Sequence, residues 1–243
     1  TESLLKTLNP NAINVRTDAI QIHQPKMMTP DLAWLLGYLW GDGAMSPSRY
    51  RLRWTDARKE NLEKAQAILK NIFNVESHIV EKQNEIAYTL EIGSKILWHW
   101  LIKNGVWKYQ SEKIDVIPTV VRTSSKESVI AFLAGLFDAD GWYGQGKATL
   151  TTADELFANH VQQVSLAVGL RFGRSKNTKG ENYQSQKSMF LMNLCGGSDP
   201  DSIDTFKKHS NKISGDLNAS NPQRVSKVGI VKSVVHHGPG RWF

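Results

Sequence analysis

The chain has 243 residues, 40% hydrophobic and 22% charged, so it is long and apolar enough to bury one large core or two small ones. Its single cysteine, Cys195, excludes an intrachain disulfide framework and a cysteine-based zinc site. The longest apolar stretch, at 32–41, has only about ten residues, too few to span a bilayer, and no signal peptide is apparent. We therefore expect a soluble intracellular protein, in the cytoplasm or nucleoid, or a fragment of one, with no membrane partner.

The charge of the chain is strongly basic, with a net charge of +7 and an isoelectric point of about 9.4. Such a balance favours a polyanion, a nucleic acid or an anionic surface as the partner, without deciding which.

Residues 1–28 form a lead-in segment in which a short strand is expected at 14–22. Thr29, Pro30 and Asp31 then predict a helix start, because a capping hydroxyl, a proline at the first helical position and an acid in the first turn follow in order. The helix is expected to run to Gly41 and to be buried, since it is apolar on all sides. A short hairpin follows, with its turn at 46–48.

Residues 49–54 alternate strictly between arginines and large apolar side chains. This period of two predicts a strand with one face in a core and Arg49, Arg51 and Arg53 on the other face. Three arginines on an open face suit phosphates and base edges, although a merely solvated face is the alternative.

The remaining pattern predicts helices at 58–73 and 95–104, separated by a hairpin of 77–80 and 86–92. The second half repeats this order. A helix capped by Ser124 or Ser125 leads to a strand at 148–151, a helix at 154–170, strands at 170–174 and 188–194, and a helix at 201–209. The repeat predicts an α+β fold, a duplicated αββαββα unit with two saddle-shaped antiparallel sheets joined by a central helix pair. We place the boundaries at 1–28, 29–122, 123–224 and a tail at 225–243, with a strand at 228–235.

The two central helices share a motif. Leu35 to Gly43 reads Leu-Leu-Gly-Tyr-Leu-Trp-Gly-Asp-Gly, and Leu133 to Gly141 reads Leu-Ala-Gly-Leu-Phe-Asp-Ala-Asp-Gly. Small residues recur every four positions in both, forming a ridge that lets two helices approach closely. We expect the helices to pack together and bring Asp42 and Asp140 to adjacent ends, each followed by a left-handed glycine.

Two acids at adjacent helix C-termini would repel each other and the helix carbonyls. A divalent cation between them removes both penalties and accepts hard oxygen ligands. The alternative is two ordinary buried helices that happen to end in Asp-Gly turns.

The second motif resembles the signature of the LAGLIDADG homing endonucleases at eight of nine positions, with Phe137 in place of isoleucine. The duplication resembles the single-chain, two-motif members. The first motif departs from the signature because Trp40 stands where its first aspartate would be, so metal binding should not need Asp138. A motif ending in Gly-Asp-Gly resembles the first motif of endonucleases embedded in inteins, and the tail up to Trp242 and Phe243 resembles the start of the strand where the splicing domain of an intein resumes.

The resemblance implies a set of site residues. Asp42 and Asp140 would bind Mg²⁺, for which Mn²⁺ can substitute, with Gly41 and Ala139 as further metal ligands. Lys113 and Lys212 would be catalytic lysines, although Lys208 competes for the second place. Thr55 or Asp56, and Thr151 or Thr152, would orient metal-bound water. Candidate DNA contacts are basic residues of the strands and hairpin loops: Arg49, Arg51, Arg53, Lys82, Arg171, Arg174, Lys176, Lys179 and Lys187.

The function that the resemblance implies is site-specific, metal-dependent double-strand cleavage of a long asymmetric DNA target, leaving short 3′ overhangs and spreading the host intein or intron. The protein is expected to act as a monomer on double-stranded DNA, with no protein partner. The alternative is a cleavage-inactive nucleic-acid-binding protein, either an RNA maturase or a DNA-binding regulator. A protein binding a small anion is less favoured, because no Gly-rich phosphate loop is present. The splicing residues of an intein are absent, so we expect an excised endonuclease region or a free-standing descendant.

Overall fold

The computed structural model describes residues 22–82, 86–106, 117–177 and 189–217, and structural statements below refer to these ranges. The chain folds as two copies of one αββαββα unit, so the predicted α+β fold is confirmed. The first copy comprises α1 (Pro30–Asp42), β1 (Gly43–Ser46), β2 (Arg51–Asp56), α2 (Lys59–Phe73), β3 (His78–Glu81), β4 (Tyr88–Gly93) and α3 (Lys95–Lys103). The second comprises α5 (Lys126–Asp140), β5 (Gly141–Gly144), β6 (Lys147–Thr152), α6 (Glu155–Ala167), β7 (Phe172–Asn177), β8 (Met189–Leu194) and α7 (Pro200–His209).

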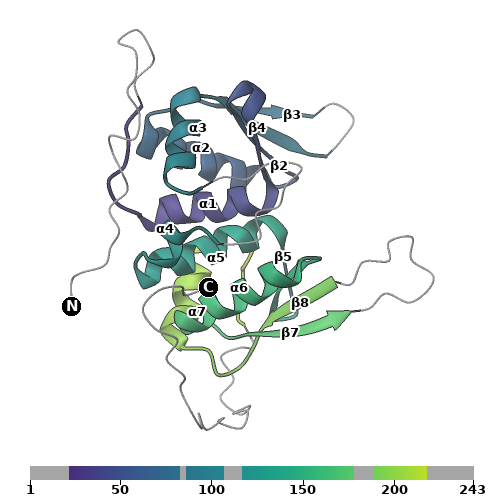
Figure 1. The fold of residues 1–243 in the computed structure, drawn as a ribbon. Coiled ribbons are helices and arrows are strands. Elements are labelled where there is room, and N and C mark those ends of the chain that lie inside the picture. Colours follow the sequence, from purple (N-terminus) through teal and green to yellow (C-terminus); the bar gives the residue numbers. More distant parts are fainter. Residues whose placement is uncertain (1–21, 83–85, 107–116, 178–188, 218–243) are drawn as a thin grey trace.

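Each copy builds a four-stranded antiparallel sheet with the same strand order, β1-β2-β4-β3 in the first and β5-β6-β8-β7 in the second. The registers also correspond, because Gly43 lies opposite Trp54 and Gly141 lies opposite Leu150. Figure 1 shows α1 and α5 side by side in the middle of the molecule, with the two sheets extending to the same side of this pair. The repeat therefore places two equivalent sheets around one central helix pair.

The central pair is held at close range by glycine. A Cβ atom on Gly37 would lie 2.0 Å from the carbonyl oxygen of Phe132, and one on Gly135 would lie 2.0 Å from that of Trp34. The two backbones thus touch at symmetric points, where a methyl group would push the helices apart. The predicted small-residue ridge is confirmed, and it sets how near the ends of α1 and α5 come to each other.

The helix starts follow the capping residues of the sequence. Thr29 accepts a hydrogen bond from the backbone N–H of Leu32, and Ser125 accepts one from that of Ser128. Because α1 and α5 are buried on nearly all sides, they form the core into which both sheets and α7 pack. Among the described helices, none has the length and apolarity needed to cross a membrane.

The first strand after the turn begins later than expected. Residues 47–49 form a 3₁₀ turn started by Pro47, and Tyr50 takes a left-handed conformation with φ of 49°. The Tyr50 ring packs edge-on against Trp98, which favours this bend. Arg49 therefore lies in the turn and not on the strand face, which corrects the prediction of a strand starting at this residue.

Two further elements differ from the sequence prediction. The short helix α4 (Thr119–Arg122), between the two copies, was not predicted. The strands expected at 14–22 and 228–235 fall almost entirely outside the described residues. The boundaries proposed between the lead-in, the halves and the tail stay predictions.

Candidate active site

The two helices that carry the motif meet at their final turns. A Cβ atom on Gly41 would lie 2.2 Å from the Cβ of Ala139 and 3.2 Å from Oδ2 of Asp140. The carboxylate of Asp140 therefore reaches across to the last turn of α1, one residue before Asp42. Only a glycine at position 41 permits this approach, which brings Asp140 of the second half to the turn of α1 that ends at Asp42.

Gly43 and Gly141 end the two helices for a reason other than the expected one. Their φ angles are −80° and −82°, which is extended and not left-handed. A Cβ on Gly43 would lie 2.5 Å from the carbonyl oxygen of Leu39, and one on Gly141 would lie 2.5 Å from that of Phe137. Glycine is needed here for close packing on the preceding turn, and the predicted left-handed caps are wrong.

The donors at this junction suit a hard divalent cation. Asp42 is half-buried and Asp140 exposed, and both carboxylates stand where the helix carbonyls already concentrate negative charge. In the described ranges, no group of three or more His, Cys, Asp or Glu side chains is arranged to hold a metal. Mg²⁺ characteristically binds through one or two carboxylates and completes its shell with water and substrate phosphate. The paired acids therefore fit Mg²⁺ better than a metal that needs a full protein cage.

Lys212 lies directly against this junction. Its Nζ donates hydrogen bonds to the carbonyl oxygens of Ala139, at 2.7 Å, and Gly141, at 3.0 Å. Burial lowers the pKa of Lys212 below its usual range, while the nearby carboxylate of Asp42 acts in the opposite direction. The ammonium is thus held beside the acids, with the Ala139 carbonyl already engaged by it.

The other two candidate lysines fall elsewhere. Lys208 lies on α7 and forms an ion pair with Glu127 at 3.1 Å. Glu127 is near the start of α5, whereas Asp140 is at the end of this helix, so Lys208 is distant from Asp140. Placement therefore favours Lys212 over Lys208 for the second half. Lys113 lies outside the described residues.

Asp138 has a different role from Asp140. It is fully buried and accepts hydrogen bonds from the Trp34 indole, at 2.9 Å, and the Ser210 hydroxyl, at 2.6 Å. The backbone N–H groups of Asn211 and Lys212 donate to it as well. Its oxygens are occupied by protein donors, so Asp138 fixes the segment after α7 to the end of α5.

The candidate water-orienting residues lie on different faces of the sheets. Thr55 and Thr151 lie on the open face of their sheets, in register with the side chains of β4 and β8 that face away from the helices. Asp56 lies on the opposite face, where Tyr38 donates to it at 2.8 Å and Asn61 at 2.8 Å. Burial and the Asp56 carboxylate raise the pKa of Tyr38 far above its usual range, so Tyr38 remains a proton donor to Asp56.

Some of the predicted basic contacts lie on the open faces of the sheets. Arg51 and Arg53 alternate with the buried Leu52 and Trp54 on β2, as predicted, and Arg51 forms an ion pair with Glu91 at 2.8 Å. Lys82 and Arg171 are exposed next to the ends of β3 and β7, and Arg49 is exposed in its turn.

Arg174 and Lys176 are on the other face of their sheet. Both lie over the ring of Phe190, a core residue, and Arg174 also pairs with Glu155 of α6 at 3.6 Å. The strand alternation places Gly173 and Ser175 on the open face instead. We therefore do not carry Arg174 and Lys176 into a nucleic-acid surface. Lys179 and Lys187 lie outside the described residues.

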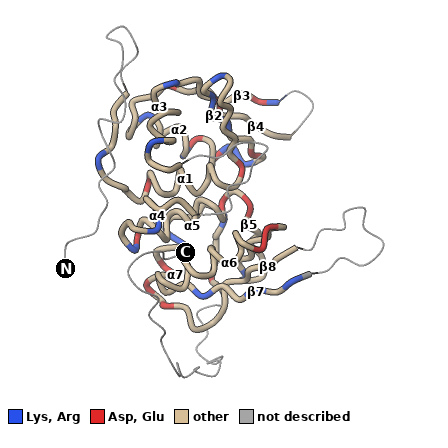
Figure 2. The backbone as a smooth tube through the Cα atoms, in the orientation of Figure 1, with Lys and Arg blue, Asp and Glu red and all other residues tan. Residues whose placement is uncertain are grey.

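Two open-face residues were not predicted from the sequence. Lys147 is exposed and occupies the register position on β6 that Arg51 has on β2. Trp142, two residues after Asp140, is 55% exposed although it is a large aromatic residue. Aligning the strand pair β5–β6 with the pair β1–β2 would have identified Lys147, because the two pairs have the same register. Figure 2 shows basic and acidic positions interspersed over both halves, so the charge of the chain does not by itself mark one face.

A chain of two αββαββα copies, whose central helices each end at an aspartate, has the architecture of two-motif LAGLIDADG proteins. The family model described as LAGLIDADG-like domain matches residues 29–103 and 127–199, one match for each copy. The chain belongs to this family, as the second motif predicted.

The curated relatives are much longer than this chain, and the match covers only a small part of each of them. The chain is 32% identical over 188 residues, 76% of its own length, to glutamine–fructose-6-phosphate aminotransferase of Methanocaldococcus jannaschii, but covers 16% of that protein. It is 29% identical over 148 residues to one of the subunits of the A-type ATP synthase of Pyrococcus abyssi, covering 59% of this chain and 14% of that protein. The chain thus spans about a sixth of the length of these relatives.

Solved structures share the fold. The homing endonuclease I-WcaI bound to its DNA recognition sequence superposes with a TM-score of 0.51 at 12% identity, covering 84% of this chain and 93% of that one. Full-length DUF199/WhiA from Thermatoga maritima gives a TM-score of 0.50 at 10% identity, covering 91% of this chain and 66% of that one. At these identities the likeness shows the fold alone.

Proposed function

We propose that this chain is a divalent-metal-dependent DNA endonuclease of the homing type, which makes a double-strand break in a long asymmetric target. The observation that supports the proposal is the close contact between the ends of α1 and α5, where Gly41, next to Asp42, packs against Ala139 and Asp140. Two acids from two similar halves suit a reaction that is performed twice, once on each strand.

The residues at the ends of α1 and α5 would have different roles in cleavage. Asp42 and Asp140, with the main-chain oxygen of Gly41, would hold Mg²⁺ or Mn²⁺, whereas the main-chain oxygen of Ala139 already accepts from Lys212. When bound, such a cation lowers the pKa of a water and stabilises a leaving oxygen. Lys212 would place its positive charge beside the phosphoryl oxygens, and Lys113 would do so for the first half. Thr55 and Thr151, on the open faces, would hydrogen-bond the attacking water.

The open faces of the two sheets would bind the DNA duplex. Arg51 and Arg53 of β2 and Lys147 of β6 project from these faces, and Arg49, Lys82 and Arg171 flank them. The net charge of +7 favours binding to the phosphate backbone. Because the two faces differ in sequence, with Arg53 opposite Ala44 but Thr149 opposite Trp142, the preferred target should be asymmetric.

The relatives support an origin in an intein. The relatives are an aminotransferase and two ATP synthase subunits, whose names indicate unrelated activities. The part of each relative that matches this chain is only 13–16% of that relative's length. A segment shared by such different proteins behaves as a module inserted into them. We infer that the endonuclease spreads a host intein by cutting uninterrupted copies of the host gene.

The proposal is tested by letting the protein select its own target. The purified chain is incubated with a library of randomised duplexes in Mg²⁺, and DNA ends with short 3′ overhangs are captured and sequenced. We expect one long asymmetric sequence to be enriched, and its cleavage to stop in EDTA. Recovery of no cleaved sequence, or of the same ends with the double variant Asp42→Asn and Asp140→Asn, would contradict it.

A second candidate function is nucleic-acid binding without cleavage. The observation that favours it is the likeness to DUF199/WhiA over 91% of the chain, since that protein is not named as an endonuclease. Against it stand the two acids and Lys212, which a pure binding protein would not need at one junction. Tight DNA binding without strand breaks in either Mg²⁺ or Mn²⁺ would favour this second function.

A further inference from the structure

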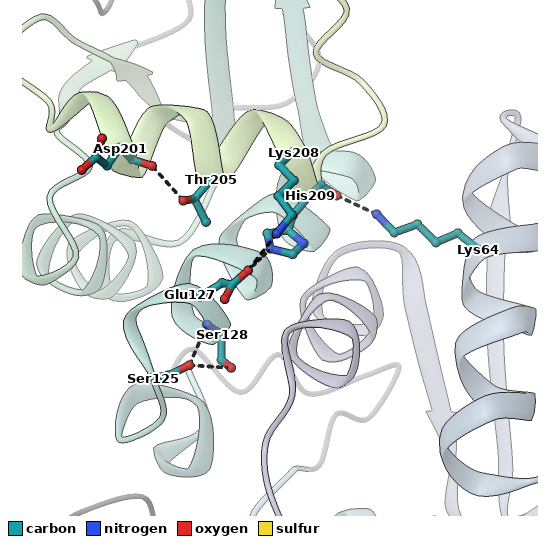
Figure 3. A network of polar contacts seen from close by, with 8 residues as sticks. All are labelled: Lys64, Ser125, Glu127, Ser128, Asp201, Thr205, Lys208 and His209. Atoms are coloured by element: carbon teal, nitrogen blue, oxygen red, sulfur yellow. Dashed lines mark hydrogen bonds and ion pairs between the residues drawn. The ribbon is translucent and has the colours of Figure 1, made fainter. Parts of the chain in front are cut away.

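The segment that carries Lys212 belongs to the second half but is bound by the first half. It follows α7, and its backbone N–H groups at 211 and 212 donate to the buried carboxylate of Asp138. Lys64 of α2, in the first half, donates to the carbonyl oxygen of His209 at 2.6 Å, and Figure 3 shows its side chain reaching from α2 to the end of α7. The lysine segment is therefore clamped between the halves.

Asn61 of α2 is the central residue of this clamp. It is fully buried, its Oδ1 accepts from Nδ2 of Asn211 at 3.0 Å, and its Nδ2 donates to the backbone carbonyl of Asp138 at 3.3 Å. The same amide donates to Asp56 at 2.8 Å. One side chain of the first half thus contacts both the segment that carries Lys212 and the residue that binds its backbone.

Other first-half groups complete the contact. The Trp34 indole donates to Asp138 at 2.9 Å, and Lys64 lies 4.0 Å from the Trp34 ring centroid. In the first half the position of Asp138 is taken by Trp40, a buried apolar side chain that offers no carboxylate to bind a segment. The clamp on the lysine of the second half is therefore built around a carboxylate that the first motif does not have.

We propose that Asn61 is a positioning residue for Lys212, acting through Asn211 and Asp138, so that the first half sets the rate at which one particular DNA strand is cut. This proposal rests on the proposed endonuclease function. Loss of the Asn61 amide would leave the Asn211 amide nitrogen without its acceptor and loosen the segment, while Asp42, Asp140 and the open sheet faces stay in place. Small misplacements of a catalytic group reduce rates strongly.

The test compares the cutting of each strand. A target duplex labelled differently on its two strands is incubated with the full chain, and Lys212→Ala first identifies the strand that depends on this lysine. We expect Asn61→Leu, which keeps the side-chain volume, to slow that strand roughly ten- to a hundredfold, to leave the other strand within about twofold, and so to accumulate nicked DNA. Lys64→Met is expected to act in the same direction but less strongly.

Ile68→Val, which trims the core side of the same helix without touching the clamp, controls for a general loss of stability and should not separate the two strands. Equal slowing of both strands by Asn61→Leu, or no slowing, would overturn the proposal.

Hydrogen exchange provides a reading that needs no cleavage. We expect the peptide containing residues 209–213 to lose protection in Asn61→Leu but not in Ile68→Val. Unchanged protection would overturn the positioning role even if the wild type cuts DNA. If the wild type cuts no DNA, the proposed function is wrong, and the exchange experiment alone shows whether Asn61 orders the segment.

Discussion

Two neighbouring aspartates of one motif have separate roles at the scale of single residues. Asp140 ends its helix at an exposed position, and Asp138, two residues earlier, is fully buried with four donor atoms directed at it. The helical turn explains the difference, because residues two apart on a helix point in different directions. A buried carboxylate must be satisfied by protein donors, whereas an exposed carboxylate can be reached by a ligand from solvent.

Replacing Asp138 should therefore reduce stability and not metal binding. Asp138→Ala would remove the acceptor of the Trp34 indole, the Ser210 hydroxyl and the Asn211 backbone N–H, while the Lys212 N–H would keep only its bond to the Ser210 hydroxyl oxygen. We expect the free energy of unfolding to fall by about 3 kcal/mol or more, as for other buried charged partners. Urea denaturation checks this, and a loss below about 0.5 kcal/mol, the range of ordinary surface changes, would show that these bonds contribute little.

Two histidines should make the protein less stable in mild acid. Burial is the main cause that lowers the pKa values of His160 and His209 below the usual value of about 6.5, while Glu127 opposes the shift at His209. Since the unfolded chain then binds more protons than the folded one, stability falls as pH drops through 6.5 and stops falling below the folded pKa values. Urea midpoints from pH 7 to pH 5 should decline less in the double variant His160→Gln and His209→Gln. Parallel declines in the two proteins would contradict this assignment.

Sequence could predict the two terminal acids because their motif repeats, but it could not predict what surrounds them. Lys212 was placed only loosely by its distance from the motif, and its contact with the Ala139 carbonyl depends on the path of the chain after α7. Asn61 looked like an ordinary polar position on an amphipathic helix. Its three partners come from three separate segments, so nothing local in the sequence marks it.

At the scale of elements, the spacing of α1 and α5 is what brings the acids together. The contact is made by backbone against backbone at Gly37 and Gly135, and by Gly41 against Ala139 near the ends. This ridge was predictable, because a four-residue repeat of small residues identifies a helix face directly. The late start of β2 was not predictable, because the left-handed Tyr50 packs on Trp98 of α3, a residue far from it in the sequence.

Adding a methyl group at the crossing should separate the helices. We expect Gly37→Ala and Gly135→Ala each to reduce the free energy of unfolding by about 1–3 kcal/mol, the range for overpacked cores. Gly93→Ala is the matched control, since a Cβ there meets no atom within 4 Å, and it should be neutral or slightly stabilising. Chemical denaturation measures all three, and equal effects at Gly37 and Gly93 would show that the helix contact is not tight.

At the scale of the whole molecule, two similar halves present unequal faces. Arg51 and Arg53 lie on the first sheet, while the second offers Lys147 and the exposed ring of Trp142 beside Asp140. The duplication and the sheet order were predicted from the repeated pattern of elements. The face occupied by Arg174 and Lys176 was not predicted, although alternation from the buried Phe172 places both on the core side of the strand.

The open faces should account for the salt dependence of DNA binding. Each lysine or arginine that contacts a phosphate releases counterions, so Arg53→Ala and Lys147→Ala should each reduce the slope of log K against log salt by about one. Lys126→Ala is the control, because Lys126 lies at the opposite end of α5 from Asp140 and pairs with Asp199. Fluorescence anisotropy titrations at several salt concentrations give the slopes, and a change in the control equal to that in Lys147→Ala would place the DNA elsewhere.

The central claim is that Asp42 and Asp140 form one metal-dependent junction that serves both strands. The most direct measurement compares plasmid cleavage and DNA affinity for the wild type, Asp42→Asn and Asp140→Asn at the selected target in Mg²⁺. We predict that the wild type linearises the plasmid and that each variant loses double-strand cleavage by about a hundredfold or more, roughly the loss seen when a key electrostatic group is removed. The DNA affinity of both variants should stay within about threefold of the wild type, a difference under about 1 kcal/mol. Full cleavage by either variant would contradict the account.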